Sequence, residues 1–434
     1  MTETMKQKIL LTYIESGFGH ISSLDSIHAA LEEQYSDVYD IQKSYIMRDD
    51  GLPHLQRMEK FIIKQVQNTN RLPWFGDFAF TVIRFFGSDH LMRFFHRQMN
   101  GKSWKEGLAA LEKRKPDVIV TNHYFTNMLA VDYKQKIDPE VKIINYNPDC
   151  TLHTFWDKRD GIFVVNNKYA FDRALKFKFK KENLREVAPC VRECVEQCNL
   201  TRQELREKHG LPQDKFTVAI ADGGYMMGRG PKFAKALIKS GLPITMLVIA
   251  GDNEERYEEF TAIAEGRGKL KLGEGATLKV YRFMKEAYEL YGAADLLLTK
   301  GGPNAVLDSI YMDTPVMINY SPHVIEKGTV RTYIRELGCG EKQGNRKKAV
   351  KRISQMMTDR TDLDAYAENI KKLKEKGNGA SAVAAIIDGL AKEQREARRD
   401  RGIIYDCDNA DDDKPQAEGV ESVGAEHSEM TSSQ

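Results

Sequence analysis

The segment L-L-L-T-K-G-G-P-N-A-V, Leu296 to Val306, decides the predicted fold of this chain. Its three leucines are typical of a buried strand, and the residues from Asn304 onward are typical of a helix. Between them, Gly301 and Gly302 permit a tight turn, and Pro303 suits the first turn of a helix, where no N–H is needed. This order of strand, glycine turn and helix predicts one unit of a parallel α/β sheet.

The same segment is a candidate anion site. The unpaired N–H groups at a helix N-terminus carry partial positive charge, and Lys300 adds a full charge beside them. Asp308 follows about one turn into the helix. A phosphate at the helix tip and ribose hydroxyls on Asp308 would suit a nucleotide. The alternative is an ordinary strand, turn and helix without a ligand.

The composition is that of a soluble globular protein of about two or three domains. Of 434 residues, 41% are hydrophobic and 29% are charged, and no run reaches the ~18–20 apolar residues of a membrane span. The start, M-T-E-T-M-K-Q-K, lacks the apolar region of a signal peptide, so we predict a cytoplasmic protein. Cys190, Cys194 and Cys198 do not have a known zinc spacing, and we predict reduced thiols and no metal site.

Charge is divided unevenly along the chain. The net charge is +2, but residues 402–434 hold nine acidic residues and one lysine, so this tail of −8 leaves +10 for the rest. The tail has almost no large apolar residue and is predicted to be disordered. The basic excess of the body is moderate, and no nucleic-acid partner is expected.

The N-terminal part begins with another unit of the same kind. A strand from Lys8 to Tyr13 leads into a loop that contains Gly17 and Gly19, and a helix is predicted from about Ser22 to Glu33. His20 lies where the loop meets the helix, so its ring can take a proton from a hydroxyl group near neutral pH. The alternative is a surface or capping histidine.

The span from Leu55 to Lys115 departs from this alternation of strands and helices. It is predicted to be helical, is rich in phenylalanine and tryptophan, and holds twelve basic and five acidic residues. Such an aromatic and cationic surface fits docking at an anionic membrane. Plain helix packing, with the aromatic residues in a core, explains the pattern equally well.

The alternation resumes with strands predicted at 117–121 and 142–146. The second of these opens into the polar loop N-P-D-C-T-L-H-T-F-W, Asn147 to Trp156. This loop faces the carboxyl edge of the sheet, where α/β proteins bind ligands. Asp149 and His153 suit acid–base chemistry or contacts with sugar hydroxyls, and Trp156 suits a stacking or interface surface.

A second series of strands and helices follows from about residue 200. A strand at 216–221 ends in a loop with Gly223 and Gly224, and Phe283 follows a later strand, where it can flank a base. Right-handed crossovers gather the loops of each series at one edge of its sheet. We therefore predict two Rossmann-like domains that face each other across a cleft. The first is an acceptor-side domain at 1–195 with the helical insertion at about 55–115, and the second is a nucleotide-binding domain at 196–400. The acidic tail follows at 401–434.

The order of these motifs resembles the GT-B glycosyltransferases, and among them the monogalactosyldiacylglycerol synthase and processive diacylglycerol glucosyltransferase family. The likeness covers most of residues 7–340. The family's motifs match four stretches of this chain: Gly17 to His20 (G-F-G-H), Asp149 with His153 and Trp156, Gly223 to Gly228 (G-G-Y-M-M-G), and Ala293 to Lys300 followed by Gly302, Pro303 and Asp308.

This resemblance implies transfer of a hexose from a UDP-sugar to a diacylglycerol-like lipid, with inversion and without a metal or other cofactor. The implied partners are the UDP-sugar, the lipid acceptor and the anionic inner face of the cell membrane. His20 and Asp149 are implied to be catalytic, with His20 as the base or its orienting partner. Gly17, Gly19, His153 and Trp156 would lie on the acceptor side. The residues implied to bind the nucleotide sugar are Gly223, Gly224, Phe283, Lys300, Gly301, Gly302, Pro303, Asn304, Asp308 and Glu326.

The chain departs from the family pattern at four positions. Tyr225 replaces a glutamate in the glycine loop, and Ala305 replaces a threonine at the helix tip. Ile325 and Thr329 replace the glutamine and asparagine of a loop thought to read the sugar. The identity of the sugar therefore stays open. Two alternatives also stay open: a UDP-sugar isomerase of the 2-epimerase type on the same two-domain plan, and a non-catalytic relative that binds UDP or lipid.

Overall fold

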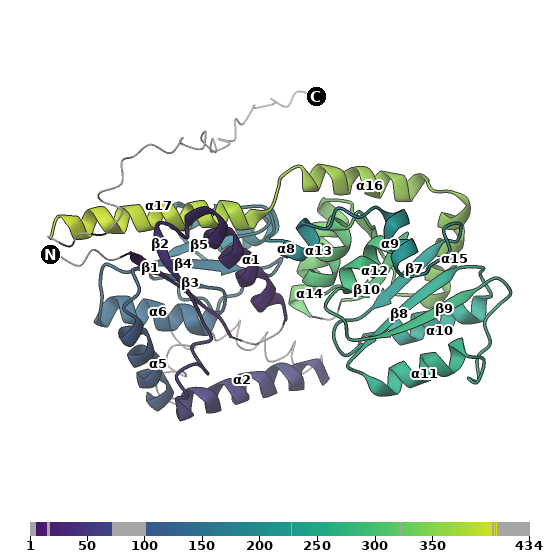
Figure 1. Cartoon of the computed structure of the whole chain (residues 1–434), viewed down its shortest axis with the longest axis horizontal. Helices are drawn as coiled ribbons and strands as arrows, with labels where there is room; N and C mark the ends of the chain where they lie inside the picture. Colours follow the sequence, from purple (N-terminus) through teal and green to yellow (C-terminus); the bar gives the residue numbers. More distant parts are fainter. Residues whose placement is uncertain are drawn as a thin grey trace, which may run out of the picture.

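Two six-stranded parallel sheets, each packed between helices, form the chain in the computed structural model (Figure 1). The structure describes residues 6–14, 18–71, 101–226, 228–321 and 323–401, together with 403 and 405. Gly17, residues 72–100 of the predicted insertion and nearly all of the predicted acidic tail lie outside the described residues. The predicted α/β class with two Rossmann-like units is confirmed.

The first sheet has the strand order β2-β1-β3-β4-β5-β6, and all its pairs are parallel. Strands β1 and β3 are buried almost throughout, which explains why they are continuous apolar runs rather than alternating ones. The strands are β1 (Gln7–Thr12), β2 (Tyr39–Ser44), β3 (Val118–Thr121), β4 (Lys142–Asn147), β5 (Ile162–Val165) and β6 (Leu184–Glu186).

The second sheet has the order β12-β11-β10-β7-β8-β9, again with parallel pairs. The strand of the opening segment, β10, is central and pairs with β7, so the loops that follow these two strands emerge side by side. The strands are β7 (Thr217–Ala221), β8 (Thr245–Gly251), β9 (Thr277–Arg282), β10 (Leu296–Lys300), β11 (Val316–Tyr320) and β12 (Gly340–Lys342).

The helices of the first sheet cover both of its faces. One face packs on α1 (Phe18–Tyr35) and α17 (Gly379–Arg399), and the other on α2 (Pro53–Arg71), α5 (Gly101–Arg114) and α6 (Tyr124–Lys136). Near the end of the sheet are α7 (Lys168–Lys176) and the 3-10 turn η1 (Lys181–Asn183). Helix α1 begins four residues before the predicted start, so His20 lies in its first turn.

The second sheet is covered in the same way. One face packs on α10 (Gly230–Ser240), α11 (Glu254–Ala264) and α15 (Arg346–Thr358). The other packs on α8 (Glu193–Glu196), α9 (Arg202–Lys208), α12 (Ala287–Ala293), α13 (Pro303–Tyr311), the π-helix η2 (Val330–Glu336) and α16 (Thr361–Lys374). The short helix α14 (Val324–Thr329) runs directly into η2. None of the helices within the described ranges is long and apolar enough to cross a membrane.

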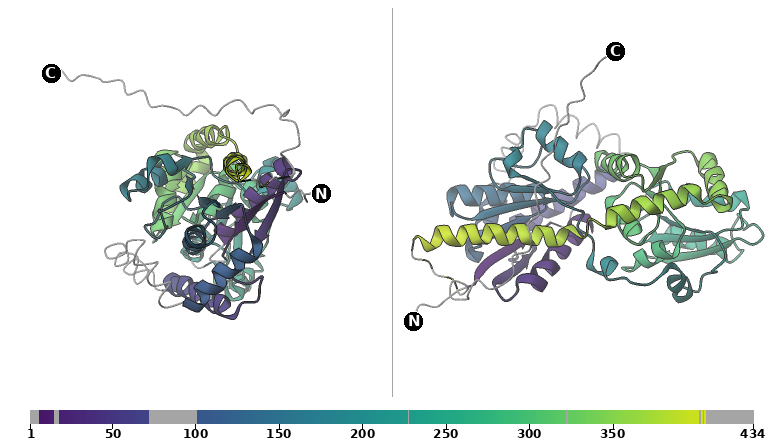
Figure 2. Two further views of the ribbon diagram at one scale, coloured as in Figure 1. Left: turned by 90° about the vertical axis from the view of Figure 1, so that its left-hand side faces the viewer. Right: turned by 90° about the horizontal axis from the view of Figure 1, so that it is seen from above.

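The chain passes between the two domains twice, and its last long helix returns to the first. Figure 2 shows α16 lying over the second domain and α17 over the first. The two passages are joined where the Asn378 amide bonds both the N–H and the carbonyl of Val191, at 3.0 and 3.2 Å. Helix α17 then buries Val383 and Ile387 against the first sheet. The structure thus differs from the predicted division, which placed 196–400 in one domain, because this apolar face matches the first sheet.

Candidate active site

His20 is positioned by a reciprocal clasp between two loops at the carboxyl edge of the first sheet. Its Nδ1 lies 2.8 Å from the Asn122 carbonyl oxygen, and the Asn122 side-chain amide donates back to the His20 carbonyl. Because a carbonyl oxygen only accepts, Nδ1 carries the proton and the lone pair of the neutral ring lies on Nε2. His20 therefore presents the tautomer that a general base needs.

Asp149 and His153 reach the same region from the loop after β4. Burial raises the pKa of the Asp149 carboxyl, and the electrostatic influence of nearby His20 opposes that rise. Burial, with Arg173 and His20 adding to the effect, lowers the pKa of His153 to about 4, so this ring is neutral at pH 7. The structure thus brings His20, Asp149 and His153 together at one edge, as the sequence predicted.

Trp156 does not have the exposed position that was predicted for it. Its side chain is only 5% exposed and packs edge-on against Phe163, at 6.1 Å between ring centroids. The loop turns back toward the sheet after His153 because Phe155 and Trp156 are both apolar enough to bury there. In this structure Trp156 anchors the loop and offers little surface to a ligand.

His123, a residue outside the predicted set, joins this group. It caps α6, with its Nδ1 accepting the N–H of Phe125 at 3.2 Å. Its ring stands edge-on to that of His20, with centroids 5.4 Å apart, and it is 5% exposed. The sequence does carry a signal for this position, since His123 is the second residue after the buried parallel strand β3 and therefore lies at the ligand-binding edge of the sheet.

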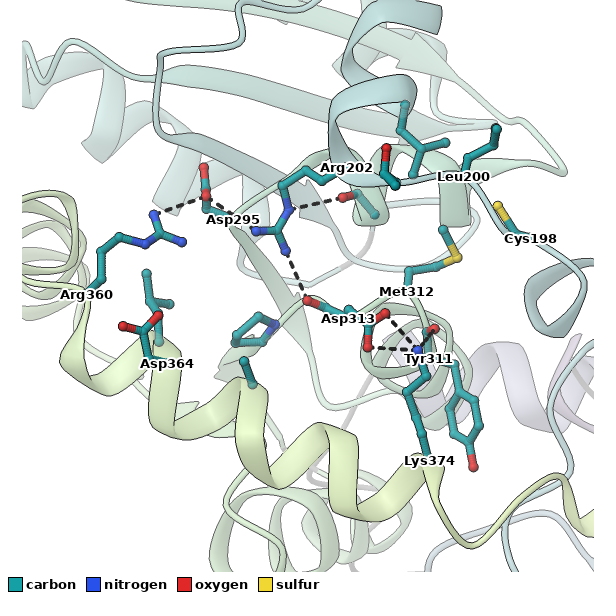
Figure 3. A pocket seen from close by; sticks show the side chains of 16 residues that line it. Cys198, Leu200, Arg202, Asp295, Tyr311, Met312, Asp313, Arg360, Asp364 and Lys374 are labelled. Carbon is teal, nitrogen blue, oxygen red and sulfur yellow. Dashed lines mark hydrogen bonds and ion pairs between the residues drawn. The ribbon is translucent and has the colours of Figure 1, made fainter.

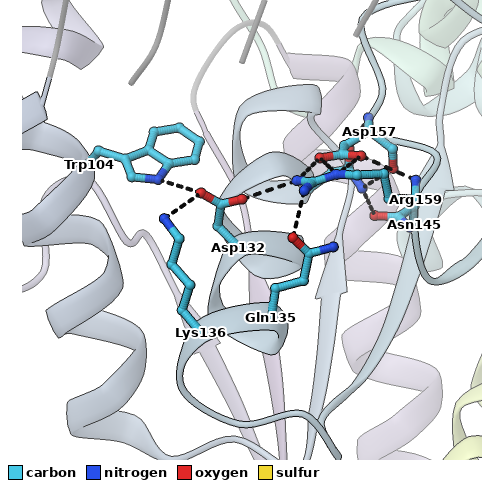
Figure 4. A network of polar contacts seen from close by, with 8 residues as sticks. Trp104, Asp132, Gln135, Lys136, Asn145, Asp157 and Arg159 are labelled. Carbon is cyan, nitrogen blue, oxygen red and sulfur yellow. Dashed lines mark hydrogen bonds and ion pairs between the residues drawn. The ribbon is translucent and has the colours of Figure 1, made fainter. Parts of the chain in front are cut away.

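A buried polar network holds the Asp149 loop in place (Figure 4). Arg159 bonds both Asp157, at 2.6 Å, and Asp132, at 3.1 Å, and neither carboxylate is exposed to solvent. The indole N–H of Trp104 donates to the same Asp132 at 3.0 Å. Trp104 belongs to the predicted aromatic insertion. It is buried and links α5 to the site loop, so this aromatic residue is part of a core.

Asp222 organises the loops on the second sheet. Its Oδ1 accepts the backbone N–H of Lys300 at 2.6 Å and the Asn319 amide at 3.3 Å, while its Oδ2 accepts the N–H of Gly230. A Cβ on Gly228 would overlap this carboxylate, so the glycine there is required. One buried side chain therefore joins the ends of β7, β10 and β11.

The tip of α13 faces the first domain, as predicted. Gly302 precedes the helix without any side-chain cap, so the amides of its first turn remain available to an anion. Asn304, in that turn, donates to the hydroxyl of Ser22 at 3.3 Å, and Ser22 lies two residues after His20. The candidate anion site and the candidate base therefore meet at the boundary between the domains.

Several predicted nucleotide-sugar residues gather around Lys300. Its Nζ lies 3.5 Å from the Glu326 carboxylate, and its side chain runs beside Gly223, which has a φ of +77°. A Cβ on Gly301 would stand 3.0 Å from the Glu326 carbonyl, so the turn packs tightly on α14. Tyr225, in the same loop as Gly223 and Gly224, is 57% exposed. The structure thus brings Gly223, Lys300, Gly301 and Glu326 into one cluster.

Asp308 is held by Arg192, a residue outside the predicted set. Arg192 donates through Nε at 3.1 Å and through Nη2 at 2.6 Å, one bond to each carboxylate oxygen. Asp308 is 7% exposed. Burial raises the pKa of its carboxyl, and Arg192 opposes that rise. Asp308 was predicted to hold ribose hydroxyls, and this role stays a prediction.

A cavity of about 380 Å³ lies at the opposite, amino edge of the second sheet (Figure 3). Asp295, just before β10, pairs there with Arg206 at 2.7 Å and Arg360 at 3.3 Å. Arg202 donates to the carbonyl of Gly292 at the end of α12. Each of these guanidinium groups is already paired within the protein, and the cavity shares no residue with the predicted site.

Comparison with known proteins identifies the class to which this fold and site belong. Two solved structures superpose on most of the chain. MurG of Acinetobacter baumannii matches with a TM-score of 0.52 and 10% sequence identity, covering 88% of this chain and 99% of MurG. Arabidopsis thaliana UGT89C1 complexed with UDP-L-rhamnose matches with a TM-score of 0.51 and 13% sequence identity, covering 90% of this chain and 100% of UGT89C1. Such low identities show the fold alone, which is GT-B.

The sequence relatives are more specific. Monogalactosyldiacylglycerol synthase 2 of Arabidopsis thaliana, a chloroplastic protein, is 26% identical over 391 residues, which cover 85% of this chain and 78% of that protein. No model of a protein family matches the chain. The chain is a glycosyltransferase with the GT-B fold, and the similarity to monogalactosyldiacylglycerol synthases that its motifs predicted is confirmed.

Proposed function

We propose that this glycosyltransferase moves a hexose from a UDP-sugar to the hydroxyl group of a diacylglycerol-like lipid at a membrane surface. The observation that carries the proposal is the contact between Asn304 and Ser22. It sets the uncapped tip of α13 opposite the helical turn that holds His20. A departing diphosphate on one side and a proton-accepting ring on the other are the two requirements of such a transfer.

In the proposed reaction the acceptor hydroxyl loses its proton to Nε2 of His20 as its oxygen attacks the anomeric carbon. The bond from that carbon to the diphosphate oxygen breaks, and UDP leaves with the electron pair. A single displacement of this kind inverts the anomeric centre. Negative charge grows on the leaving diphosphate, where Lys300 and the first amides of α13 stabilise it most in the transition state.

Titration calorimetry with UDP tests the nucleotide half of this proposal. We expect Lys300→Ala to weaken UDP binding by about tenfold to a hundredfold, since a charge-assisted hydrogen bond contributes about 1.5–3 kcal/mol. Lys372→Ala removes an exposed lysine on α16 and should leave the affinity unchanged. Equal affinity in all three proteins would remove the assignment of Lys300.

The acceptor half is tested by incubating the enzyme with a panel of UDP-hexoses and extracted membrane lipids, read by mass spectrometry. A new glycolipid supports the proposal. Conversion of the UDP-sugar without any lipid product would favour an isomerase, and UDP binding without turnover for every hexose would favour a non-catalytic relative. The panel also decides which sugar is used, a question raised by Ile325 and Thr329.

We also propose that α2 rests on the anionic membrane surface. Its exposed residues Arg57, Lys60, Phe61 and Lys64 follow a helical spacing of three and four, while Leu55, Met58 and Ile62 pack on the core. Phe61 is 55% exposed, although it is large and apolar. Basic side chains around one exposed aromatic ring form the pattern of an interfacial helix.

Vesicle flotation tests this docking face. Replacing Arg57, Lys60 and Lys64 by glutamine should reduce binding to anionic vesicles about a hundredfold, at roughly 1 kcal/mol for each charge near the surface. The matched control replaces Lys347, Lys348 and Lys351, three exposed lysines of α15, by glutamine. If both triple variants float like the unaltered protein, α2 is not the docking face.

A further inference from the structure

Arg192 lies in the first passage between the domains, yet its side chain belongs to the second domain. It directly precedes α8 and forms the two-bond contact with Asp308 of α13. Its guanidinium also lies 5.4 Å from the centre of the Tyr288 ring. The side chain is 28% exposed, so the pair is largely screened from water.

The geometry of this pair leaves Asp308 able to bind further groups. Arg192 donates one hydrogen bond to each carboxylate oxygen, and each oxygen of the ionised group has a second lone pair that can accept another hydrogen bond. A buried carboxylate without a cation would tend to take up a proton and would then be a poorer acceptor. Arg192 thus keeps Asp308 charged and fixes the plane of the carboxylate, while each oxygen keeps one position for a hydroxyl group.

The same guanidinium contacts the loop that follows β9. Its Nη1 lies 3.4 Å from the carbonyl oxygen of Lys285, two residues after Phe283, the residue predicted to flank a base. Phe283 is 40% exposed. Arg192 therefore connects the two elements that would hold the two parts of a nucleoside, the α13 carboxylate and the β9 loop.

We infer that Arg192 is a positioning residue for the nucleoside half of the donor, acting through Asp308 on the ribose hydroxyls. This inference rests on the proposed function. Arg192 itself need not touch the ligand. If Arg192 acts in this way, the protein should bind a nucleotide with ribose hydroxyls more tightly than one without them. This preference should depend on the bidentate geometry of the guanidinium as well as on its charge.

The test compares UDP with 2′,3′-dideoxy-UDP by titration calorimetry. We expect the unaltered protein to prefer UDP by about tenfold to a hundredfold, because two hydroxyls donate to a charged carboxylate. Arg192→Met should reduce that preference to within about threefold. Arg192→Lys, which keeps the charge without the bidentate geometry, should give an intermediate value and guards against a misfolded methionine variant.

Arg335→Met is the matched control, because it removes an exposed arginine of η2 in the same domain and should keep the full preference. A full preference in both Arg192 variants would overturn the inference and leave the proposed function intact. Equal affinity of the unaltered protein for the two nucleotides would overturn the ribose role of Asp308 and the inference with it. No binding of UDP at all would overturn the nucleotide half of the proposed function as well.

Discussion

Replacement of His20 by alanine should lower the rate of sugar transfer by about a hundredfold to ten-thousandfold, the usual contribution of a general base. The ring holds its proton on Nδ1 against the Asn122 carbonyl, so only Nε2 can take the proton of an acceptor hydroxyl. UDP affinity should stay the same, because the residues predicted to bind UDP lie on the second domain. Turnover and calorimetry on the same preparation measure the two effects.

The clasp between His20 and Asn122 also has a structural role, which a second variant separates. His20→Asn can still donate to the Asn122 carbonyl, but it cannot accept a proton from a hydroxyl group. If the clasp were the only function of His20, the asparagine variant would have normal turnover. If His20 is the general base, the asparagine variant should be as slow as the alanine variant. His28→Ala, on the same helix, is the control for loss of a ring. Near-normal turnover in His20→Ala would exclude a catalytic part for this residue.

Asp222→Ala should both destabilise the second domain and weaken UDP binding. The substitution leaves the N–H groups of Lys300 and Gly230 without their acceptor in a buried position. Two lost bonds to a charged group are expected to cost about 3–5 kcal/mol. Because the same carboxylate sets the relative position of the loops after β7 and β10, UDP affinity should fall by about tenfold or more. Thermal unfolding and calorimetry measure the two losses.

Asp222→Asn distinguishes the carboxylate from the space that it fills. The amide keeps the volume and one acceptor oxygen but turns an N–H₂ toward an N–H, so both losses should be intermediate. Glu258→Ala removes an exposed carboxylate of α11 and should change neither quantity. An Asp222→Ala protein with unaltered unfolding temperature and UDP affinity would contradict the bracing role.

The parts of the site that could be predicted are those encoded within a few neighbouring residues. A leucine run, a glycine pair and Pro303 specify a strand, a turn and a helix start by local sterics and hydrogen bonding, and the structure shows all three. His20 and Asp149 could be placed at the same edge because parallel strands put all their following loops there. His123 satisfies the same rule, and its side chain also caps α6.

The fold class, the edge at which the ligand residues gather and the order of the two domains could therefore be predicted from local patterns alone. Four features depend instead on the packing of distant segments: Arg192 pairs with Asp308, 116 positions later, Asp222 braces three loops, Trp156 is buried, and α17 returns to the first sheet. The two groups differ in the distance along the chain over which the interactions act. Turns and caps depend on neighbours along the chain, whereas ion pairs and buried faces depend on which distant surfaces pack together, and no local pattern records that choice.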